Sequence, residues 1–274
     1  MLVAMSRRIF IVGDGFAGKL AAIRLARTHD VVLLSNPRAR HGVDPASERL
    51  IGKPAHSHVF LPRLLVELEA MAPEVLETLA QRGLSFSPGA KGLRRHLANG
   101  AKRLFAMRWQ VDAALNACIS EHFAGEVRPF AVGGLETEAS ANGLAITALQ
   151  PAENGSPLAI HPDDVVVDAT GAQKTLMDGL IGDTGLLIRR SSYMSYMSQF
   201  FRLEAGVVVD ELPEPLFSCS VNFGQGYITL YPGGDGGFSI TLAHDMRKPD
   251  TRAQGRYTAD LVFFALRAGG RARL

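Results

Sequence analysis

The chain has 274 residues, a length that predicts one or two domains with a sizeable buried core. Hydrophobic residues make up 47% and charged residues 20%, which excludes a disordered chain, and a net charge of +2 favours neither nucleic acid nor an anionic membrane. The two cysteines, Cys118 and Cys219, stand too far apart in the sequence for a CxxC pair, so we expect no disulfide framework and a reducing, cytoplasmic compartment.

The first predicted elements form one βαβ unit. Residues 8–12 are a short apolar strand, residues 16–28 a helix rich in alanine, and residues 31–34 a second strand that is apolar throughout. A strand, a helix and a strand within about 30 residues favour a parallel sheet. No stretch reaches the ~18–20 apolar residues of a membrane helix, so we expect no integral membrane segment.

The remaining chain predicts helices first and strands later. Residues 36–62 are a long polar connection that contains four prolines. Apolar spacing and breakers predict helices at 63–71, from 73 to 83, and at 109–123, and short strands at 127–132, 144–148 and 165–167. From residue 187 onward the pattern is β, with strands expected at 188–202, 219–223, 227–231 and 238–243. We expect a first domain of residues 1–180 and a second, β-rich one of residues 181–274.

Residues 13–18 read Gly-Asp-Gly-Phe-Ala-Gly and match the GxGxxG pattern of a dinucleotide-binding turn. The pattern follows a strand and opens a helix, which is the context that this function requires. The first glycine allows the tight turn, the second lets a pyrophosphate approach the backbone and the third lets the helix pack on the strand, while the helix N-terminus attracts phosphate. We expect the segment to contribute Gly13, Gly15, Phe16, Ala17 and Gly18 to the site. A glycine-rich turn without a ligand is the alternative.

The second strand ends without the acidic residue that usually binds a ribose. Ser35 and Asn36 stand at that position, and Arg38 and Arg40 follow. A hydroxyl or an amide binds a ribose more weakly than a carboxylate, whereas the arginines favour a 2′-phosphate and therefore NADP. A solvated loop without a specific role is a further alternative. We expect Ser35 and Asn36 to lie in the cofactor site.

Four further segments carry motifs in a recognisable order. Residues 53–62 read KPAHSHVFLP, residues 107–115 read MRWQVDAAL, residues 163–171 read DDVVVDATG, and a β-rich stretch contains LYP at 230–232 and FSITL at 238–242. Together with the glycine loop they resemble the FAD-dependent monooxygenases of the aromatic hydroxylase type, including polyprenylphenol hydroxylases. The resemblance runs from about residue 9 to residue 243.

The resemblance implies an α/β fold with a Rossmann-like FAD/NAD(P)-binding domain and an antiparallel β-sheet substrate domain. It places His56 beside the dinucleotide, Arg108 near the flavin, and Thr170 and Gly171 at the cofactor. It also implies a flavoprotein oxidoreductase that hydroxylates a small organic substrate through reduced FAD and O₂, with NAD(P)H as electron donor. Because the flavin performs the hard chemistry in such enzymes, we expect no catalytic acid, base or nucleophile.

Two departures from the family bear on function. Ser35 replaces the ribose-binding acid, and because a charged acceptor binds more strongly than a neutral one, we expect Ser35→Glu to tighten FAD. The family's later G-D motif is missing before Leu274, and Gly182 with Asp183 does not match its position. We therefore expect the N-terminal portion of such an enzyme, truncated at the C-terminus, with a separate C-terminal fragment or a homo-oligomer as partner. A flavin-dependent alkene reductase and a non-catalytic, nucleotide-binding remnant are the alternatives.

Other candidate residues receive simpler interpretations. His56 and His58 provide only two imidazoles, so we expect no metal. Asp168 ends an apolar strand, and we expect it to act as a turn or cap residue. Tyr193 and Tyr196 could line a substrate pocket, but we expect them to pack in the core.

Overall fold

The structure is a computed structural model of the 274-residue chain. The chain divides into two compact units. One unit contains residues 1–41 and 112–189, and the other contains residues 42–111 and 190–274. The expected domains, residues 1–180 and 181–274, stay a prediction. The compact units differ from them in that residues 42–111 belong to the same unit as the C-terminal strands. The described residues are 7–37, 42–43, 50–51, 57–60, 62–81, 86–88, 102–141, 143–171, 176–177, 180, 193–203, 220–222, 226–232, 237–245, 247 and 272–273.

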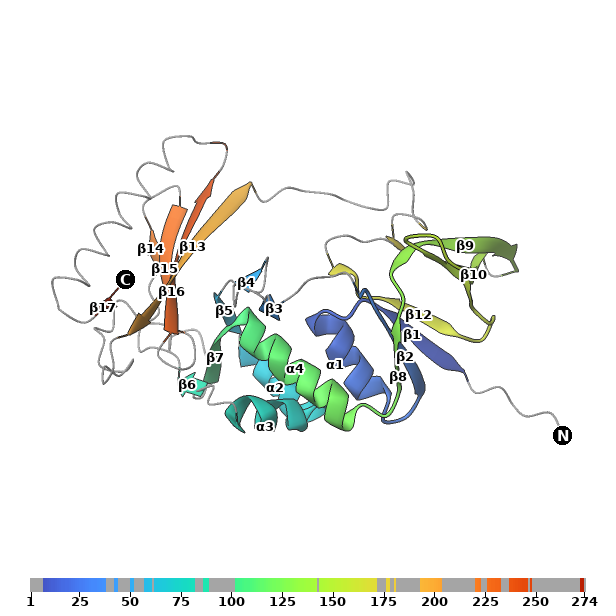
Figure 1. The fold of residues 1–274 in the computed structure, drawn as a ribbon, viewed down its shortest axis with the longest axis horizontal. Helices are drawn as coiled ribbons and strands as arrows, with labels where there is room; N and C mark the ends of the chain where they lie inside the picture. The colour runs from blue at the N-terminus through green and yellow to red at the C-terminus, as the bar shows by residue number, and fades with distance from the viewer. Residues whose placement is uncertain are drawn as a thin grey trace. The chain divides into compact units, whose positions relative to one another are not determined.

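A four-stranded parallel sheet lies at the centre of the first unit, in the order β12-β1-β2-β8 (Figure 1). Its strands are β1 (Arg8–Val12), β2 (Asp30–Ser35), β8 (Glu126–Pro129) and β12 (Val165–Asp168). Helix α1 (Phe16–Leu25) connects β1 to β2, as the predicted βαβ unit requires. The helix ends before residue 28 because the N–H groups of Thr28 and His29 both donate to the Leu25 carbonyl and close a turn into β2.

Side-chain alternation along β1 and β2 gives the sheet two buried faces. Alternate residues on one face, among them Ile11 and Leu33, pack with Ala22 of α1 and with Ile119 of α4 (Arg108–His122). The other face, which includes Phe10, is covered by residues of a second sheet. The continuous apolar strands are thus buried on both sides, the arrangement typical of parallel sheets.

The second sheet of this unit has three antiparallel strands in the order β11-β10-β9. It consists of β9 (Val132–Ser140), β10 (Gly143–Pro151) and β11 (Leu158–Ala159). The expected strand 127–132 is in fact two, because Phe130 N donates to the Ser35 carbonyl at the end of β8 and the chain then enters β9. Leu149 and Ile160 from this sheet region join the core cluster of Phe10.

The second unit begins with short strands and two helices. The long polar connection 36–62, in which the sequence predicts no strand, contains β3 (Gly42–Val43), β4 (Leu50–Ile51) and β5 (Ser57–Phe60). β5 pairs with β7 (Lys102–Met107), which also pairs with β6 (Phe86–Pro88), so distant segments create this sheet. Helices α2 (Pro62–Met71) and α3 (Pro73–Gln81) lie close to their predicted positions.

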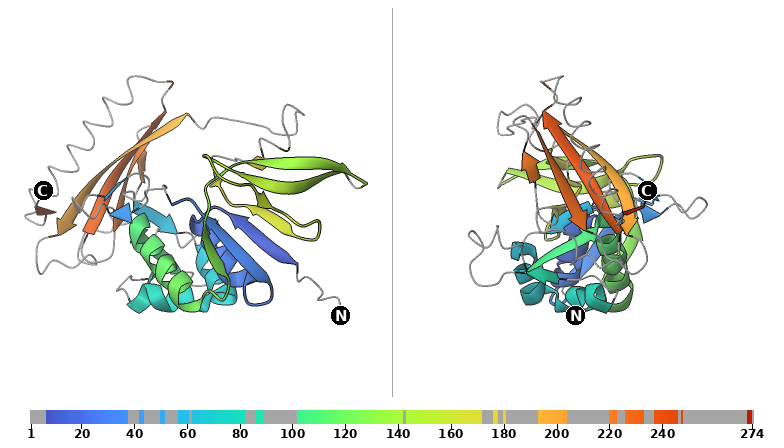
Figure 2. Two further views of the ribbon diagram at one scale, coloured as in Figure 1. Left: turned by 45° about the vertical axis from the view of Figure 1, so that its right-hand side comes forward. Right: turned by 90° about the vertical axis from the view of Figure 1, so that its left-hand side faces the viewer.

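The same unit contains a five-stranded antiparallel sheet in the order β14-β15-β16-β13-β17, drawn with its main strands in orange in Figure 2. Its strands are β13 (Met194–Leu203), β14 (Ser220–Asn222), β15 (Gly226–Pro232), β16 (Gly237–Asp245) and β17 (Ala272–Arg273). The first four fall on predicted strands. Ser198 Oγ and Thr241 Oγ1 lie 2.8 Å apart across the β13–β16 pair, which satisfies a buried hydroxyl. None of the helices in the described parts of the chain is long and apolar enough to span a membrane.

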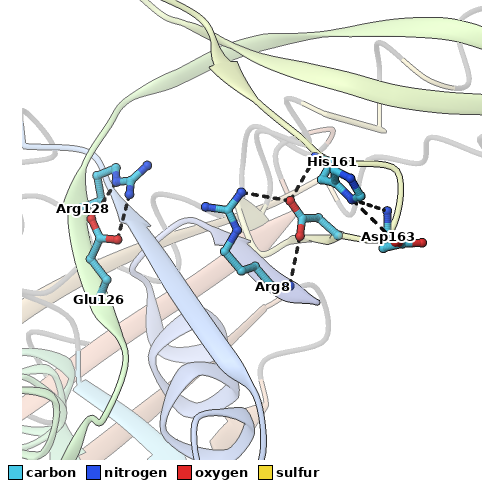
Figure 3. A network of polar contacts seen from close by, with 6 residues as sticks. Arg8, Glu126, Arg128, His161 and Asp163 are labelled. Carbon is cyan, nitrogen blue, oxygen red and sulfur yellow. Dashed lines mark hydrogen bonds and ion pairs between the residues drawn. The ribbon is translucent and has the colours of Figure 1, made fainter. Parts of the chain in front are cut away.

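At the amino end of the parallel sheet, Asp164 binds the beginning of β1. Figure 3 labels two of its partners, Arg8 and His161. Its carboxylate accepts hydrogen bonds from the backbone N–H groups of Arg8 and His161, each at 3.0 Å, and from the Arg8 guanidinium at 3.3 Å. Only 3% of the Asp164 side chain is exposed. Burial raises the pKa of Asp164, but the hydrogen bonds and the Arg8 charge together outweigh it and hold the pKa below its ordinary value.

Candidate nucleotide-binding site

The loop after β1 makes a tight turn that only glycine accommodates easily at its first position. Gly13 has a φ of +106°, a conformation that residues with side chains rarely adopt, and its N–H donates to the Leu34 carbonyl at 3.0 Å. A Cβ on Gly13 would lie 2.8 Å from the Ala169 carbonyl oxygen. The first glycine of the motif is therefore required both by backbone conformation and by its contact with the neighbouring strand.

The other two glycines have different surroundings. A Cβ on Gly18 would lie 1.8 Å from the Gly13 carbonyl oxygen, so the third glycine lets α1 pack directly against the loop. Among the described residues, nothing lies within 4 Å of a Cβ placed on Gly15. Gly15 is also the N-cap of α1 and has no side chain to cap the first-turn N–H groups of the helix, which begins with Phe16 and Ala17. The second glycine therefore exposes the helix N-terminus to an open side.

The parallel register brings three loops to one edge of the sheet. Val12 is paired with Leu34 of β2 and with Asp168 of β12, and Ala169 N donates to the Val12 carbonyl at 2.9 Å. The glycine loop, Ser35 with Asn36, and the turn 169–171 consequently all follow the carboxyl ends of adjacent strands. Open α/β sheets bind their ligands at this edge.

Asp168 shapes the turn after β12. Its Oδ1 accepts hydrogen bonds from Thr170 N at 2.9 Å and from Thr170 Oγ1 at 2.6 Å, and its Oδ2 accepts from Met177 N at 3.4 Å. Gly171 then adopts a φ of +70°. The carboxylate therefore holds the backbone of the predicted site residues Thr170 and Gly171 in place, as expected for a turn residue.

An acidic side chain that the sequence motifs did not single out lies at the end of β2. Ser35 Oγ donates a hydrogen bond to Asp14 Oδ2 at 2.6 Å, and both residues are half-buried. Asp14 is the second residue of the glycine motif, a position for which that motif specifies no side chain. The pairing of β1 with β2 brings this carboxylate to the position where the sequence alone indicated that an acid was missing.

The remaining predicted residues lie elsewhere. Arg108 is the first residue of α4 and belongs to the second compact unit, and its role near a flavin stays a prediction. His56, Arg38 and Arg40 lie outside the described residues, as do Gly182 and Asp183. Within the described residues, no group of three or more His, Cys, Asp and Glu side chains could hold a metal ion.

The expectation that Tyr193 and Tyr196 pack in the core is wrong. Their exposed fractions are 44% and 52%, and Tyr193 has a φ of 53° at the start of β13. The Tyr193 ring lies against Arg247, whose Cζ is 4.7 Å from the ring centroid. Alternation along a strand predicts two faces, but it does not indicate which face another layer covers.

Comparison with known proteins finds a similar fold in solved structures of flavin-dependent enzymes. No protein-family model matches the chain, and the search of curated proteins found no match. Among solved structures, Xcc4156, a flavin-dependent halogenase from Xanthomonas campestris, matches 91% of the chain with a TM-score of 0.61 and 17% identity. PqsL, described as a probable FAD-dependent monooxygenase from Pseudomonas aeruginosa, matches 89% with a TM-score of 0.60 and 15% identity. The flavin-dependent halogenase CmlS matches 98% with a TM-score of 0.60 and 19% identity.

The chain shares the fold of these flavin-dependent enzymes. It spans 58% of the Xcc4156 chain, 62% of the PqsL chain and 48% of the CmlS chain. At these identities the likeness concerns the fold, a mixed α/β architecture with a parallel sheet. The expected α/β class is confirmed at that level.

Proposed function

We propose that this chain binds FAD at the carboxyl edge of its parallel sheet and acts in a flavin-dependent monooxygenation of a small organic substrate, with NAD(P)H as electron donor. One observation carries the proposal: the glycine loop leaves an open side at Gly15 and at the N-terminus of α1, in a fold shared with flavin-dependent enzymes. The other two glycines, Gly13 and Gly18, have internal reasons to be glycine. Gly15 has none within the described residues.

The chemistry of the loop fits a pyrophosphate. The first-turn N–H groups of α1, among them those of Ala17 and Gly18, carry the positive end of the helix dipole. A side chain at Gly15 would occupy the space through which phosphate oxygens reach them. We assign Thr170 and Gly171 to the same cofactor because they lie after the adjacent strand β12 at the same edge.

In the proposed enzyme the residues of this chain bind and orient the cofactor. When bound, FAD supplies the redox chemistry through which reduced flavin activates O₂. The glycine loop holds the pyrophosphate, and Ser35 with Asn36 lies where the adenosine ribose is bound in this kind of sheet. The sequence resemblance alone supports assigning His56 and Arg108 to the cofactor and the antiparallel sheet of β13 to β17 to the substrate.

The test is to load the purified 274-residue chain with FAD, FMN, NAD or NADPH in separate samples and to measure bound visible absorbance and thermal stability. FAD is expected to remain bound after desalting and to raise Tm more than FMN, because FMN lacks the adenosine and the pyrophosphate link that the glycine loop would hold. A protein that stays colourless after FAD loading, yet is stabilised by NADPH, would refute the proposal.

A second measurement separates monooxygenation from its alternatives. NAD(P)H oxidation and O₂ uptake are followed together in the presence of FAD and a panel of phenols, other aromatic substrates and alkenes. Substrate-dependent O₂ uptake supports a monooxygenase, whereas NAD(P)H oxidation that saturates an alkene without O₂ uptake supports a reductase. Tight FAD binding with neither activity supports a nucleotide-binding role.

A further inference from the structure

Asp14 and Ser35 together form a polar pair at the edge where the adenosine of a dinucleotide is expected. Asp14 lies in the turn after β1, and Ser35 is the last residue of the neighbouring strand β2. The Ser35 hydroxyl has one proton, and it donates this proton to Asp14 Oδ2 at 2.6 Å. The hydrogen bond fixes the direction of the carboxylate. The second oxygen of Asp14, Oδ1, has no hydrogen-bond partner among the described residues.

We propose that Asp14 is the ribose-binding acid of this chain, positioned by Ser35, and that the pair selects adenosine nucleotides with a free 2′-hydroxyl. This inference rests on the proposed FAD site and names the residue that recognises its adenosine. A carboxylate at the end of β2 usually accepts the ribose hydroxyl, and here it arrives from the loop of the adjacent strand. In this arrangement the Ser35 hydroxyl hydrogen-bonds to the Asp14 carboxylate and not to the ligand.

The charge of the pair decides between two classes of nucleotide. A carboxylate accepts a hydroxyl proton in a charge-assisted hydrogen bond, which is roughly twice as strong as a neutral one. The same carboxylate repels a 2′-phosphate, and the Ser35 hydroxyl cannot donate to that phosphate because Asp14 already accepts its proton. The site therefore favours FAD, ADP or NAD over NADP, in contrast to the alternative based on Arg38 and Arg40.

Two ligand pairs test this on the whole chain by calorimetry. ADP is compared with 2′-deoxy-ADP, and ADP-ribose with 2′-phospho-ADP-ribose. The wild-type protein is expected to bind the first member of each pair about tenfold more tightly. In Asp14→Ala the preference for ADP over 2′-deoxy-ADP is expected to fall to about threefold or less, since a charge-assisted acceptor is lost.

Further variants serve as controls. Asp14→Asn retains an oxygen that accepts the Ser35 proton, so it keeps the loop in shape while it removes the charge, and it is expected to tolerate the 2′-phosphate better. Asp163→Asn removes the same charge from an exposed side chain just before β12, at the opposite end of the sheet, and is expected to leave both ratios unchanged.

The outcomes separate this inference from the proposed function. A wild-type protein that binds ADP and FAD but does not distinguish ADP from 2′-deoxy-ADP overturns the role of Asp14 and leaves the FAD site standing. A preference for ADP that survives unchanged in a folded Asp14→Ala or Asp14→Asn protein has the same consequence. Failure of the wild-type protein to bind any of these nucleotides overturns both.

Discussion

Lys19 Nζ lies 2.7 Å from Asp112 Oδ1, and the two side chains are only 8% and 15% exposed. Lys19 comes directly after Gly18 of the glycine loop, and Asp112 lies in α4, so the ion pair ties the helix of the candidate nucleotide site to a helix distant in sequence. A buried charge that loses its partner is costly, because neither water nor another ion compensates it. The pair is therefore a structural connection on which the position of α1 depends.

Removing either member of this pair is expected to destabilise the protein. Lys19→Met leaves the Asp112 carboxylate without its cation, and a loss of about 3 kcal/mol is expected, the lower end for buried pairs because Asp112 is 15% exposed. The double variant Lys19→Met with Asp112→Leu is expected to recover most of this loss, since no unpaired charge remains. Urea unfolding of the three proteins measures the coupling.

A matched control lies on α2, where Arg63 forms an exposed ion pair with Glu67 one turn later. Arg63→Met is expected to change the free energy of unfolding by less than about 0.5 kcal/mol. Equal losses in Arg63→Met and Lys19→Met would contradict the structural role assigned to the Lys19–Asp112 pair.

Glycine substitutions are expected to separate packing from binding within one loop. Gly18→Ala places a methyl group 1.8 Å from the Gly13 carbonyl oxygen, so α1 must shift, and a loss of stability of about 1–3 kcal/mol or more is expected. The methyl group of Gly15→Ala meets no atom of the described residues within 4 Å, so this variant is expected to stay folded. Its FAD affinity is expected to fall about two- to tenfold, equivalent to one neutral hydrogen bond. Thermal unfolding and FAD titration of both variants provide the measurements. Unchanged FAD affinity in a folded Gly15→Ala protein would exclude this loop as the phosphate cradle.

The sequence predicted the elements that local residue patterns determine. It did not predict features that depend on the pairing of strands from different parts of the chain. The unit β1–α1–β2 follows from apolar strands and a glycine turn within one short segment, and its bounds agree closely with the structure. β5 and β7 went unpredicted because they pair with each other across a long intervening segment of the chain. Asp14 was missed for a similar reason, since its contact with Ser35 depends on the β1–β2 register and the rule for ribose binding considers only the end of the second strand.

Asp164 predicts how stability changes in acid. Because its pKa in the folded protein is lowered, its carboxylate contributes fully above the ordinary Asp pKa of about 3.9, and the contribution is lost as pH falls through the folded pKa. Asp164→Asn weakens the hydrogen bonds that this side chain accepts from Arg8 and His161. It is expected to lower the free energy of unfolding by about 1.5–3 kcal/mol at neutral pH. Urea unfolding across the acid range should show the difference from wild type shrinking below about pH 4.

The neighbouring Asp163 offers the control for that experiment. Its side chain is 79% exposed, and Asp163→Asn is expected to change the free energy of unfolding by no more than about 0.5 kcal/mol at any pH. A stability difference for Asp164→Asn that stays constant from neutral to strongly acidic pH would show that shape, and not the ionised carboxylate, accounts for the loss.

The hydrogen bond between Ser35 and Asp14 changes the effect that we expect of Ser35→Glu. From the sequence the new carboxylate should tighten FAD, but the Ser35 hydroxyl already donates to Asp14 at 2.6 Å, so glutamate would face a second carboxylate. Two like charges about 4 Å apart repel by up to ~4 kcal/mol at an effective dielectric constant of 20, and a tenfold loss of FAD affinity needs only about 1.4 kcal/mol of this. We therefore expect Ser35→Glu to weaken FAD binding about tenfold or more.

The exchanged pair Asp14→Ser with Ser35→Glu keeps one carboxylate and one hydroxyl at the same edge, and it is expected to recover FAD affinity to within about threefold of wild type. Titration of the three proteins with FAD decides the matter, because tighter binding by the single variant would mean that Asp14 does not face the ribose.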